Sequence, residues 1–117
     1  MIIAERIEEL IEEIDLDGAL EMIEIFLYDP EFGISKRLNN LEVSLDNKDG
    51  IALSKEAHIL KGSASNFEAT DVVQLSGLLE EQGIRNELEK AQQTFNKLKD
   101  ASKILMGELV QIKQRYV

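Results

Sequence analysis

The chain contains a single histidine, His58, within the stretch from Ser54 to Ser65. If this stretch is helical, at 100° per residue, an apolar stripe repeats every three or four residues and His58 lies about 100° away from it. The apolar stripe consists of Leu53, Ala57, Leu60, Ala64 and Phe67. Because that stripe should face a core, the imidazole should face solvent. An unperturbed imidazole is largely neutral at pH 7 and is a nitrogen nucleophile that needs no separate base.

Two neighbours of His58 favour chemistry on an incoming anion. Lys61, one turn later, can bring an ammonium to a negatively charged group on the imidazole, although a solvated surface lysine is the alternative. Gly62 is disfavoured inside a helix by about 1 kcal/mol relative to alanine. A bare backbone there would admit another protein beside His58, whereas the alternative is close packing against a neighbouring helix. We predict that His58 and Lys61 carry the chemistry and that partner docking uses Gly62, Ile51, Ser54 and Ser65.

Helical periodicity over most of the sequence predicts the elements that position His58. A short first helix covers 3–14, and a long one covers 16–45 with a bend or interruption at 29–33, where Pro30 removes a main-chain donor. The histidine helix should cover 50–67, and two more should cover 70–83 and 87–112. The candidate N-caps are Asp15 or Asp17, Asn47 or Asp49, Thr70 or Asp71, and Asn86.

The sequence shows no strand-like alternation, internal repeat or linker. A sustained 3.5-residue apolar period on consecutive helices with short loops is typical of antiparallel bundles. The predicted fold is therefore all-α, an antiparallel (up-down) four-helix bundle with an additional short N-terminal helix that packs over one end. We expect residues 1–117 to form one such domain.

Composition limits the classes of function. Thirteen Lys and Arg against 23 Asp and Glu give a net charge of −10 at pH 7, which opposes nucleic acids and anionic membranes. Cysteine is absent, which excludes disulfides and thiolate metal sites and fits a reducing compartment. The start of the sequence lacks the features of a signal peptide, and no segment approaches 18 apolar residues. We expect a soluble, cytoplasmic protein with neither a nucleic acid nor a membrane as partner.

The carboxylates suggest no site of their own. They do not converge with a second histidine or form a D-x-D-x-D loop, so we expect no metal site. The acidic pairs at 8–9, 12–13 and 80–81 are interpreted as solvated helix faces. The sequence has no Gly-rich phosphate loop and no adenine-binding signature, so the chain should not phosphorylate itself from ATP.

The run from His58 to Ala64 resembles the H-x-L-K-G-S-[SA] signature of histidine-containing phosphotransfer (HPt) domains. These are helical bundles that relay phosphoryl groups to and from response-regulator receiver domains. The resemblance extends over residues 16–112, through the helices before and after the histidine helix. One departure is that Glu68 and Ala69 stand where the family usually has Gly-Ala.

The resemblance implies that the chain is a stoichiometric phosphocarrier of a two-component phosphorelay and not an enzyme. His58 would accept a phosphoryl group from a receiver aspartate and pass it to another. The chain itself would need no cofactor, because Mg²⁺ is expected on the partner receiver. The implied partners are receiver domains, including that of a hybrid histidine kinase. Docking should be largely hydrophobic given the net charge.

Two other interpretations remain open. One is the phosphotransfer domain of a chemotaxis-type histidine kinase, which Phe67 suits, although a chain that starts at Met1 and has 117 residues favours a free-standing carrier or an excised domain. The other is a non-catalytic adaptor bundle that binds receivers. Glu68 supports this second reading, because a carboxylate near the helix end could disfavour a phosphohistidine, unless it pairs with Lys61.

Overall fold

Six helices make up the chain between residues 2 and 116, the part that the computed structural model describes, and no strand occurs there. The helices are α1 (Ile3–Glu13), α2 (Leu16–Tyr28), α3 (Ile34–Asp46), α4 (Gly50–Ser65), α5 (Thr70–Ile84) and α6 (Leu88–Gln114). The all-α prediction is thus confirmed. None of these helices is both long and apolar enough to cross a membrane.

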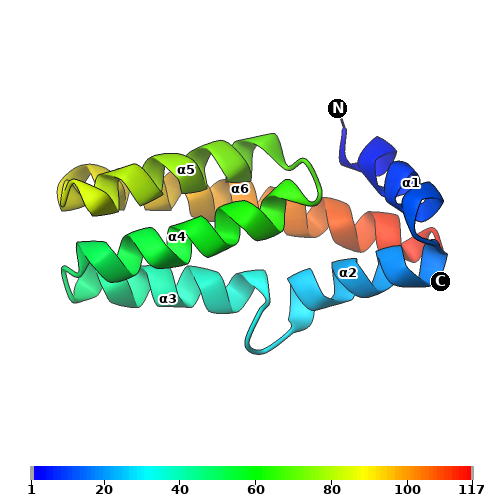
Figure 1. The fold of residues 1–117 in the computed structure, drawn as a ribbon, viewed down its shortest axis with the longest axis horizontal. Helices are drawn as coiled ribbons and strands as arrows, with labels where there is room; N and C mark the ends of the chain where they lie inside the picture. The colour runs from blue at the N-terminus through cyan, green and yellow to red at the C-terminus, as the bar shows by residue number, and fades with distance from the viewer. Residues whose placement is uncertain (1, 117) are drawn as a thin grey trace.

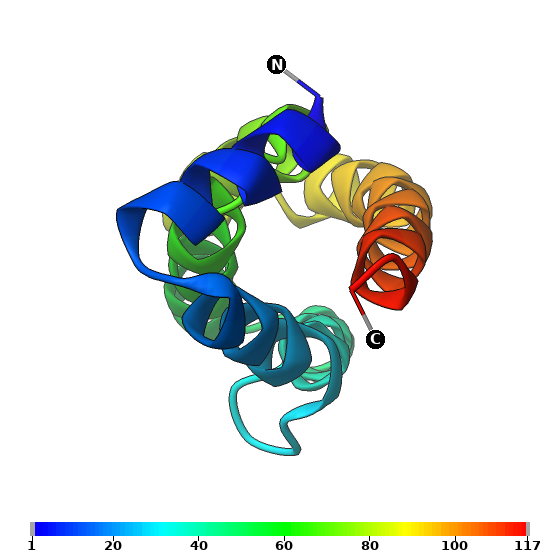
Figure 2. The ribbon, with the colours of Figure 1, turned by 90° about the vertical axis from the view of Figure 1, so that its right-hand side faces the viewer.

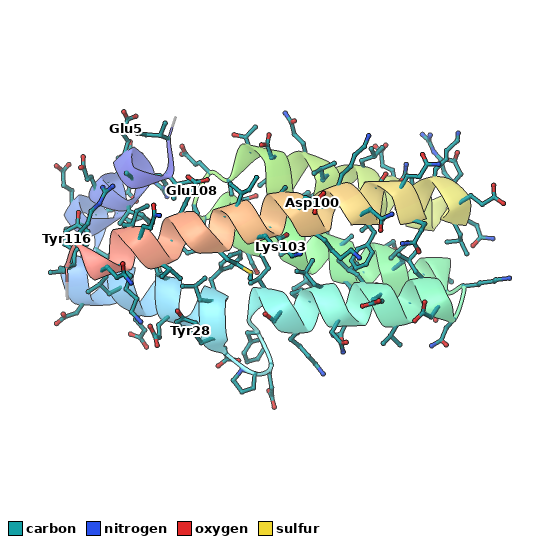
Figure 3. The ribbon with its side chains drawn as sticks, turned by 180° about the vertical axis from the view of Figure 1, so that it is seen from behind. Glu5, Tyr28, Asp100, Lys103, Glu108 and Tyr116 are labelled. Carbon is teal, nitrogen blue, oxygen red and sulfur yellow. The ribbon has the colours of Figure 1, made fainter. Side chains whose placement is uncertain are left out.

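Four rods surround one core, and α2 and α3 together form one of them (Figure 1). Going round the bundle, α3 packs on α4, α4 on α5, α5 on α6, and α6 returns to both α3 and α2. Seen from behind, α6 runs the length of the bundle past both halves of the interrupted rod (Figure 3). The end-on view shows α1 lying obliquely across one end, as expected (Figure 2).

The interruption between α2 and α3 lies where the sequence predicts it. Asp29 ends α2 with extended backbone, which the following proline favours. Its Oδ2 accepts hydrogen bonds from the backbone N–H of Glu31 (2.9 Å) and Phe32 (2.7 Å). A Cβ on Gly33 would lie 2.5 Å from the Asp29 carbonyl oxygen, so only glycine fits this turn. The loop is therefore a defined structure.

The predicted apolar stripe of the histidine helix faces the core. All five of its residues are buried, although α4 ends at Ser65 and not at Phe67. The Phe67 ring still packs edge-on against Phe26 of α2, with centroids 5.1 Å apart. This contact anchors the end of α4 to the interrupted rod.

Helix caps agree with the sequence in two places and differ in two. The side chains of Asp15 and Asp49 accept hydrogen bonds from backbone N–H groups in the first turns of α2 and α4. The predicted cap on Asn86 is wrong, since α6 is preceded by Glu87 and has no side-chain cap. Asn86 instead has φ 56° and closes a Schellman turn at the end of α5. Ala69 occupies the N-cap of α5, so Thr70 and Asp71 lie inside the helix.

Two glycines bring α4 and α5 unusually close. A Cβ on Gly83 would lie 2.7 Å from the Gly50 carbonyl oxygen and 2.9 Å from the Ser54 nitrogen, both of them main-chain atoms. A Cβ on Gly50 would in turn lie 2.5 Å from the Gly83 carbonyl oxygen. The two helices can approach this closely only because neither position carries a side chain.

We expect Gly83→Ala to destabilise the fold. Overpacking against rigid backbone costs about 1–3 kcal/mol, and alanine's better helix propensity returns about 1 kcal/mol at most. Gly107→Ala in α6 is the matched control, because no atom lies within 4 Å of its Cβ position and the change should stabilise. Urea unfolding of both variants measures the difference. A Gly83→Ala protein at least as stable as wild type would contradict the close contact.

Candidate functional site

His58 lies in the middle of α4 with its side chain 64% exposed, as the helical projection predicts. Gly62 and Ser65 are exposed on the same side of the helix, and Lys61 is partly exposed beside α5. The exposed imidazole therefore lies on a helix whose other side is anchored in the core by buried Leu53, Ala57 and Leu60.

A carboxylate from α5 joins His58 to Lys61. Glu80 Oε2 lies 2.8 Å from His58 Nδ1, and Glu80 Oε1 lies 3.0 Å from Lys61 Nζ. The Glu80 side chain is only 21% exposed, so the interpretation of residues 80–81 as one solvated face is wrong for Glu80. Glu81, one residue on, is exposed.

Glu80 is negatively charged at neutral pH. A hydrogen bond from the Lys61 ammonium is the main cause that lowers the pKa of its carboxyl; burial opposes this effect, and the charge of Lys61 and the contact with His58 add to it. An ionised carboxylate only accepts hydrogen bonds. It therefore favours the imidazole tautomer that carries its proton on Nδ1, which leaves the lone pair on Nε2.

The stem of Lys61 lies against another glycine. A Cβ on Gly77 of α5 would be 3.5 Å from Lys61 Cδ, in ordinary contact. A small residue at position 77 thus gives the lysine room to lie along α5 and reach Glu80. Its ammonium is held one turn from the imidazole instead of extending freely into solvent.

Gly62 faces open space. Apart from the backbone of its own helix turn and its chain neighbours, no atom lies within 4 Å of the position that its Cβ would occupy. The alternative in which Gly62 permits close helix packing is therefore excluded, in contrast to Gly50 and Gly83.

The other predicted docking residues occupy different surroundings. Ile51 is exposed at the start of α4, two turns before His58. Ser65 is exposed, and its hydroxyl donates to the Lys61 carbonyl oxygen (2.6 Å). Ser54 is half-buried against Gly83, and its hydroxyl donates to the Ile51 carbonyl oxygen (3.0 Å). Both hydroxyls thus bond to their own helix and not to His58.

Glu68 lies outside this site. It has φ 51° and closes a Schellman turn after α4, in the left-handed conformation that glycine adopts without strain. This geometry explains why glycine suits the position that Glu68 occupies. The alternative in which Glu68 pairs with Lys61 is wrong, because Lys61 pairs with Glu80 and the Glu68 carboxylate instead lies 3.9 Å from Arg6 of α1.

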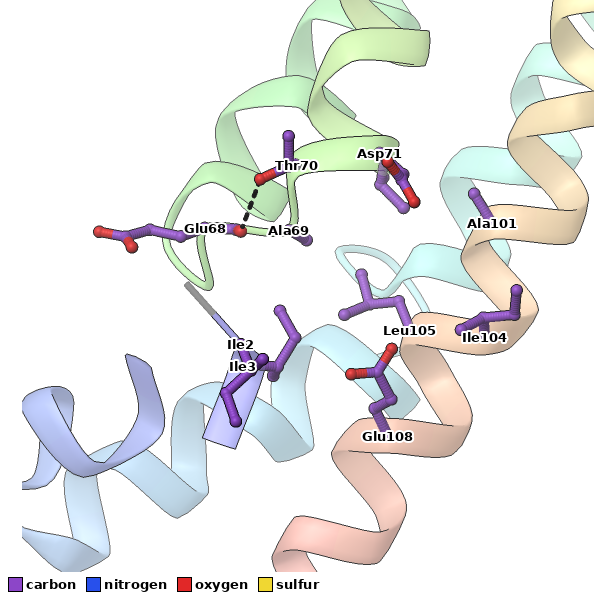
Figure 4. A pocket seen from close by; sticks show the side chains of 11 residues that line it. Ile2, Ile3, Glu68, Ala69, Thr70, Asp71, Ala101, Ile104, Leu105 and Glu108 are labelled. Atoms are coloured by element: carbon purple, nitrogen blue, oxygen red, sulfur yellow. Dashed lines mark hydrogen bonds between the residues drawn. The ribbon is translucent and has the colours of Figure 1, made fainter. Parts of the chain in front are cut away.

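A cavity of about 260 Å³ next to Glu68 is separate from His58 (Figure 4). It lies between the start of α1, the start of α5 and the middle of α6, and the Glu68 side chain points away from it. The Thr70 hydroxyl donates to the Glu68 carbonyl oxygen (3.4 Å) at its edge. Glu68 lies beyond the end of α4, whose stretch from His58 to Ser65 already covers about 10 Å, and its carboxylate lies beside Arg6, so it does not strongly repel a group on the imidazole.

Comparison with known families identifies one match. The model of the Hpt domain matches residues 33–111, more than half of the chain. Neither the curated proteins nor the solved structures gave a match. The matched residues include His58, Lys61 and Glu80, and they exclude α1 and α2.

Proposed function

Because the chain belongs to the Hpt domain family, whose members are histidine phosphotransfer modules of phosphorelays, we propose that His58 is its phosphoryl-accepting residue. The observation that carries the proposal is the contact between Glu80 and Nδ1 of an exposed imidazole. It leaves Nε2 as the nucleophilic nitrogen, directed away from Glu80. The partners proposed are receiver domains, including that of a hybrid histidine kinase, and the compartment proposed is the cytoplasm.

The transfer needs no proton movement within this chain. The Nε2 lone pair attacks the phosphorus of a receiver's aspartyl phosphate, an N–P bond forms, and the P–O bond to the aspartate breaks. The ring then carries a positive charge with its proton still on Nδ1, and the Glu80 carboxylate stabilises that charge. In the reverse step the ring leaves as neutral imidazole, so the same contact supports transfer in both directions.

Lys61 supplies a second charge at the site. Its ammonium, 3.0 Å from Glu80, can turn toward phosphoryl oxygens as negative charge spreads over them. The receiver is expected to bring Mg²⁺, so no cofactor is proposed for this chain. A phosphotransfer domain of a chemotaxis-type kinase would take the phosphoryl group from ATP on a separate kinase domain, but it would pass the group to a receiver aspartate by the same step.

The direct test is incubation with a panel of phosphorylated receiver domains. Phosphate should appear on the chain in an acid-labile, base-stable form, as expected for a phosphoramidate bond to nitrogen. Absence of label with every receiver, in a folded protein, would favour the adaptor interpretation. Acid-stable label would move the chemistry to a hydroxyl group.

We expect Glu80→Gln to slow transfer to His58 about tenfold, in line with the loss of one charged group that acts through another. A glutamine oxygen can still accept from Nδ1, but it cannot offset the charge that develops on the ring. Glu81→Gln removes the same charge from the next, exposed residue and should leave the rate unchanged. Rapid-quench transfer from one receiver compares the two variants, and equal rates would remove Glu80 from the site.

The two variants should also differ in acid. A carboxyl whose pKa is lower in the folded chain stabilises the fold above its unfolded pKa, and that contribution is lost as pH falls through the folded value. Below the ordinary glutamate value of 4.5, wild type and Glu81→Gln should therefore lose stability more steeply than Glu80→Gln. Thermal unfolding between pH 7 and pH 3 measures this.

A further inference from the structure

A second cavity lies on the other flank of α4 from Glu80. It has a volume of about 180 Å³ and is lined from α2, from the loop before α3 and from the end of α4. Phe26 and Phe67 form its buried wall, and Ile25, Phe32 and Ser63 lie around it. Together with exposed Ile59, one turn before Ser63, these residues are called the Phe32 patch. Asn66 also lines the cavity and is exposed, but the large exposed side chains of the patch, Ile25, Phe32 and Ile59, are apolar. Such exposure requires an explanation in a chain of net charge −10.

Phe32 is held in place although its side chain is 65% exposed. Its backbone N–H is bound by Asp29, as described above, and the Arg37 guanidinium donates to the carbonyl oxygen of Glu31. Arg37 also pairs with Glu56 of α4 at 2.8 Å, which ties the loop to the helix that carries His58. An aromatic ring on a preorganised loop loses little conformational entropy when a partner covers it.

The patch lies within the area that a protein docked on His58 would cover. Ser63 follows His58 by five residues, about 7.5 Å along the helix axis and about 140° round it, and Ile59 lies between the two at about 100° from His58. A standard interface buries about 800 Å² on each partner, equivalent to a disc of about 16 Å radius. A receiver whose aspartate reaches His58 Nε2 would therefore extend over Ile59 and the cavity.

Half of the patch, Phe32 included, lies outside the stretch that matches the Hpt domain model. That stretch begins at residue 33, directly after Phe32, so the helix α2 and the loop up to Phe32 are not part of what the family model matches. Residues that touch the partner but lie outside the shared stretch are suited to distinguish one partner from another.

We propose that the Phe32 patch is a specificity site, in which the cavity receives an apolar side chain of the receiver domain that exchanges phosphate with His58. The proposal rests on the proposed function, and it adds which surface selects the receiver. Attraction is apolar because the chain's negative charge offers no steering toward an acidic partner. Phe32 is the anchor, and the buried aromatic wall of the cavity is the surface that the partner's side chain contacts.

The test compares Phe32→Ala with Ile104→Ala. Ile104 is equally exposed, at 64%, but lies on α6, on the opposite side of the bundle from α4 (Figures 1 and 3). With the receiver that reacts fastest with wild type, Phe32→Ala should lower the transfer rate at least tenfold. The ratio of the rate with this receiver to the rates with other receivers should therefore become smaller. Phe32→Leu, which keeps an apolar side chain, should retain most of the rate, and Ile104→Ala should retain all of it.

A small donor separates this proposal from the function on which it rests. Phosphoramidate transfers its phosphoryl group to an imidazole with release of ammonia and needs no docking surface, so it should label His58 equally in all variants. Phe32→Ala could take up phosphate from phosphoramidate as wild type does and also keep the wild-type rates with every receiver. That result would overturn the specificity site and leave the proposed function intact. Failure of both donors to label His58 in wild type would overturn the proposed function.

Discussion

His58→Gln should abolish phosphoryl uptake from every receiver while leaving the free energy of unfolding almost unchanged. Glutamine is similar in length but has no nucleophilic ring nitrogen. The substituted side chain is mostly exposed, and an exposed ion pair or hydrogen bond such as that to Glu80 contributes about 1 kcal/mol or less. Label on the chain after incubation with a phosphorylated receiver, together with urea unfolding, measures both effects.

Lys55→Gln, at an exposed position on the same helix, is the control for a general effect of glutamine on α4. It should take up phosphate at the wild-type rate. Retained labelling of His58→Gln would assign the phosphate to another side chain. If His58→Gln instead lowered the free energy of unfolding by several kcal/mol, His58 would be a structural residue, and an adaptor bundle would be favoured.

The sequence was sufficient for the parts of this fold that depend on local periodicity. The stripe from Leu53 to Phe67 determines which side of α4 is buried, and hence that His58 is exposed. Pro30 and Gly33 determine the interruption between α2 and α3, because one lacks a donor and the other fits a turn closed on Asp29. Such features need no knowledge of the neighbouring helices.

Features that depend on how far one helix is shifted along another could not be predicted. Lys61 lies four residues before the end of α4, whereas Glu80 lies ten residues after the start of α5. Their contact therefore requires a stagger between the helices that the loop alone does not reveal. The close approach of Gly50 and Gly83 sets that stagger, yet from sequence each glycine is equally compatible with an ordinary helix end.

Turns after helices were the other source of error. Asn86 and Glu68 both occupy left-handed positions that close Schellman turns. Asparagine is a common residue both at an N-cap and at such a C-terminal position, so its type could not decide between α5 and α6. Glutamate is rare at such a position, and its charge suggested a role in repelling phosphate. In the structure, position 68 is instead a strained turn after a helix.

Gly62 gives the second large effect, because stability and transfer should respond to it in opposite directions. The position is helical and exposed, and a Cβ there meets no other atom within 4 Å. Gly62→Ala should therefore stabilise the domain by up to about 1 kcal/mol through helix propensity. The same substitution at Gly83 should lower the stability of the domain. The two variants together therefore test whether Gly83 is needed for helix packing and Gly62 is not.

Gly62→Gln should also fold, since glutamine is a good helix former and its side chain can extend into solvent. That side chain would occupy the space one turn from His58 through which a receiver's loop must bring its aspartyl phosphate in line with Nε2. A displacement of about 1 Å in such an approach costs about a hundredfold in rate, so receiver-to-histidine transfer should fall by at least tenfold. Labelling by phosphoramidate should persist, because a small donor needs no such clearance. Normal receiver transfer by Gly62→Gln would mean that the bare backbone is not there for a partner, and the reason for an unfavourable residue at this position would have to lie elsewhere.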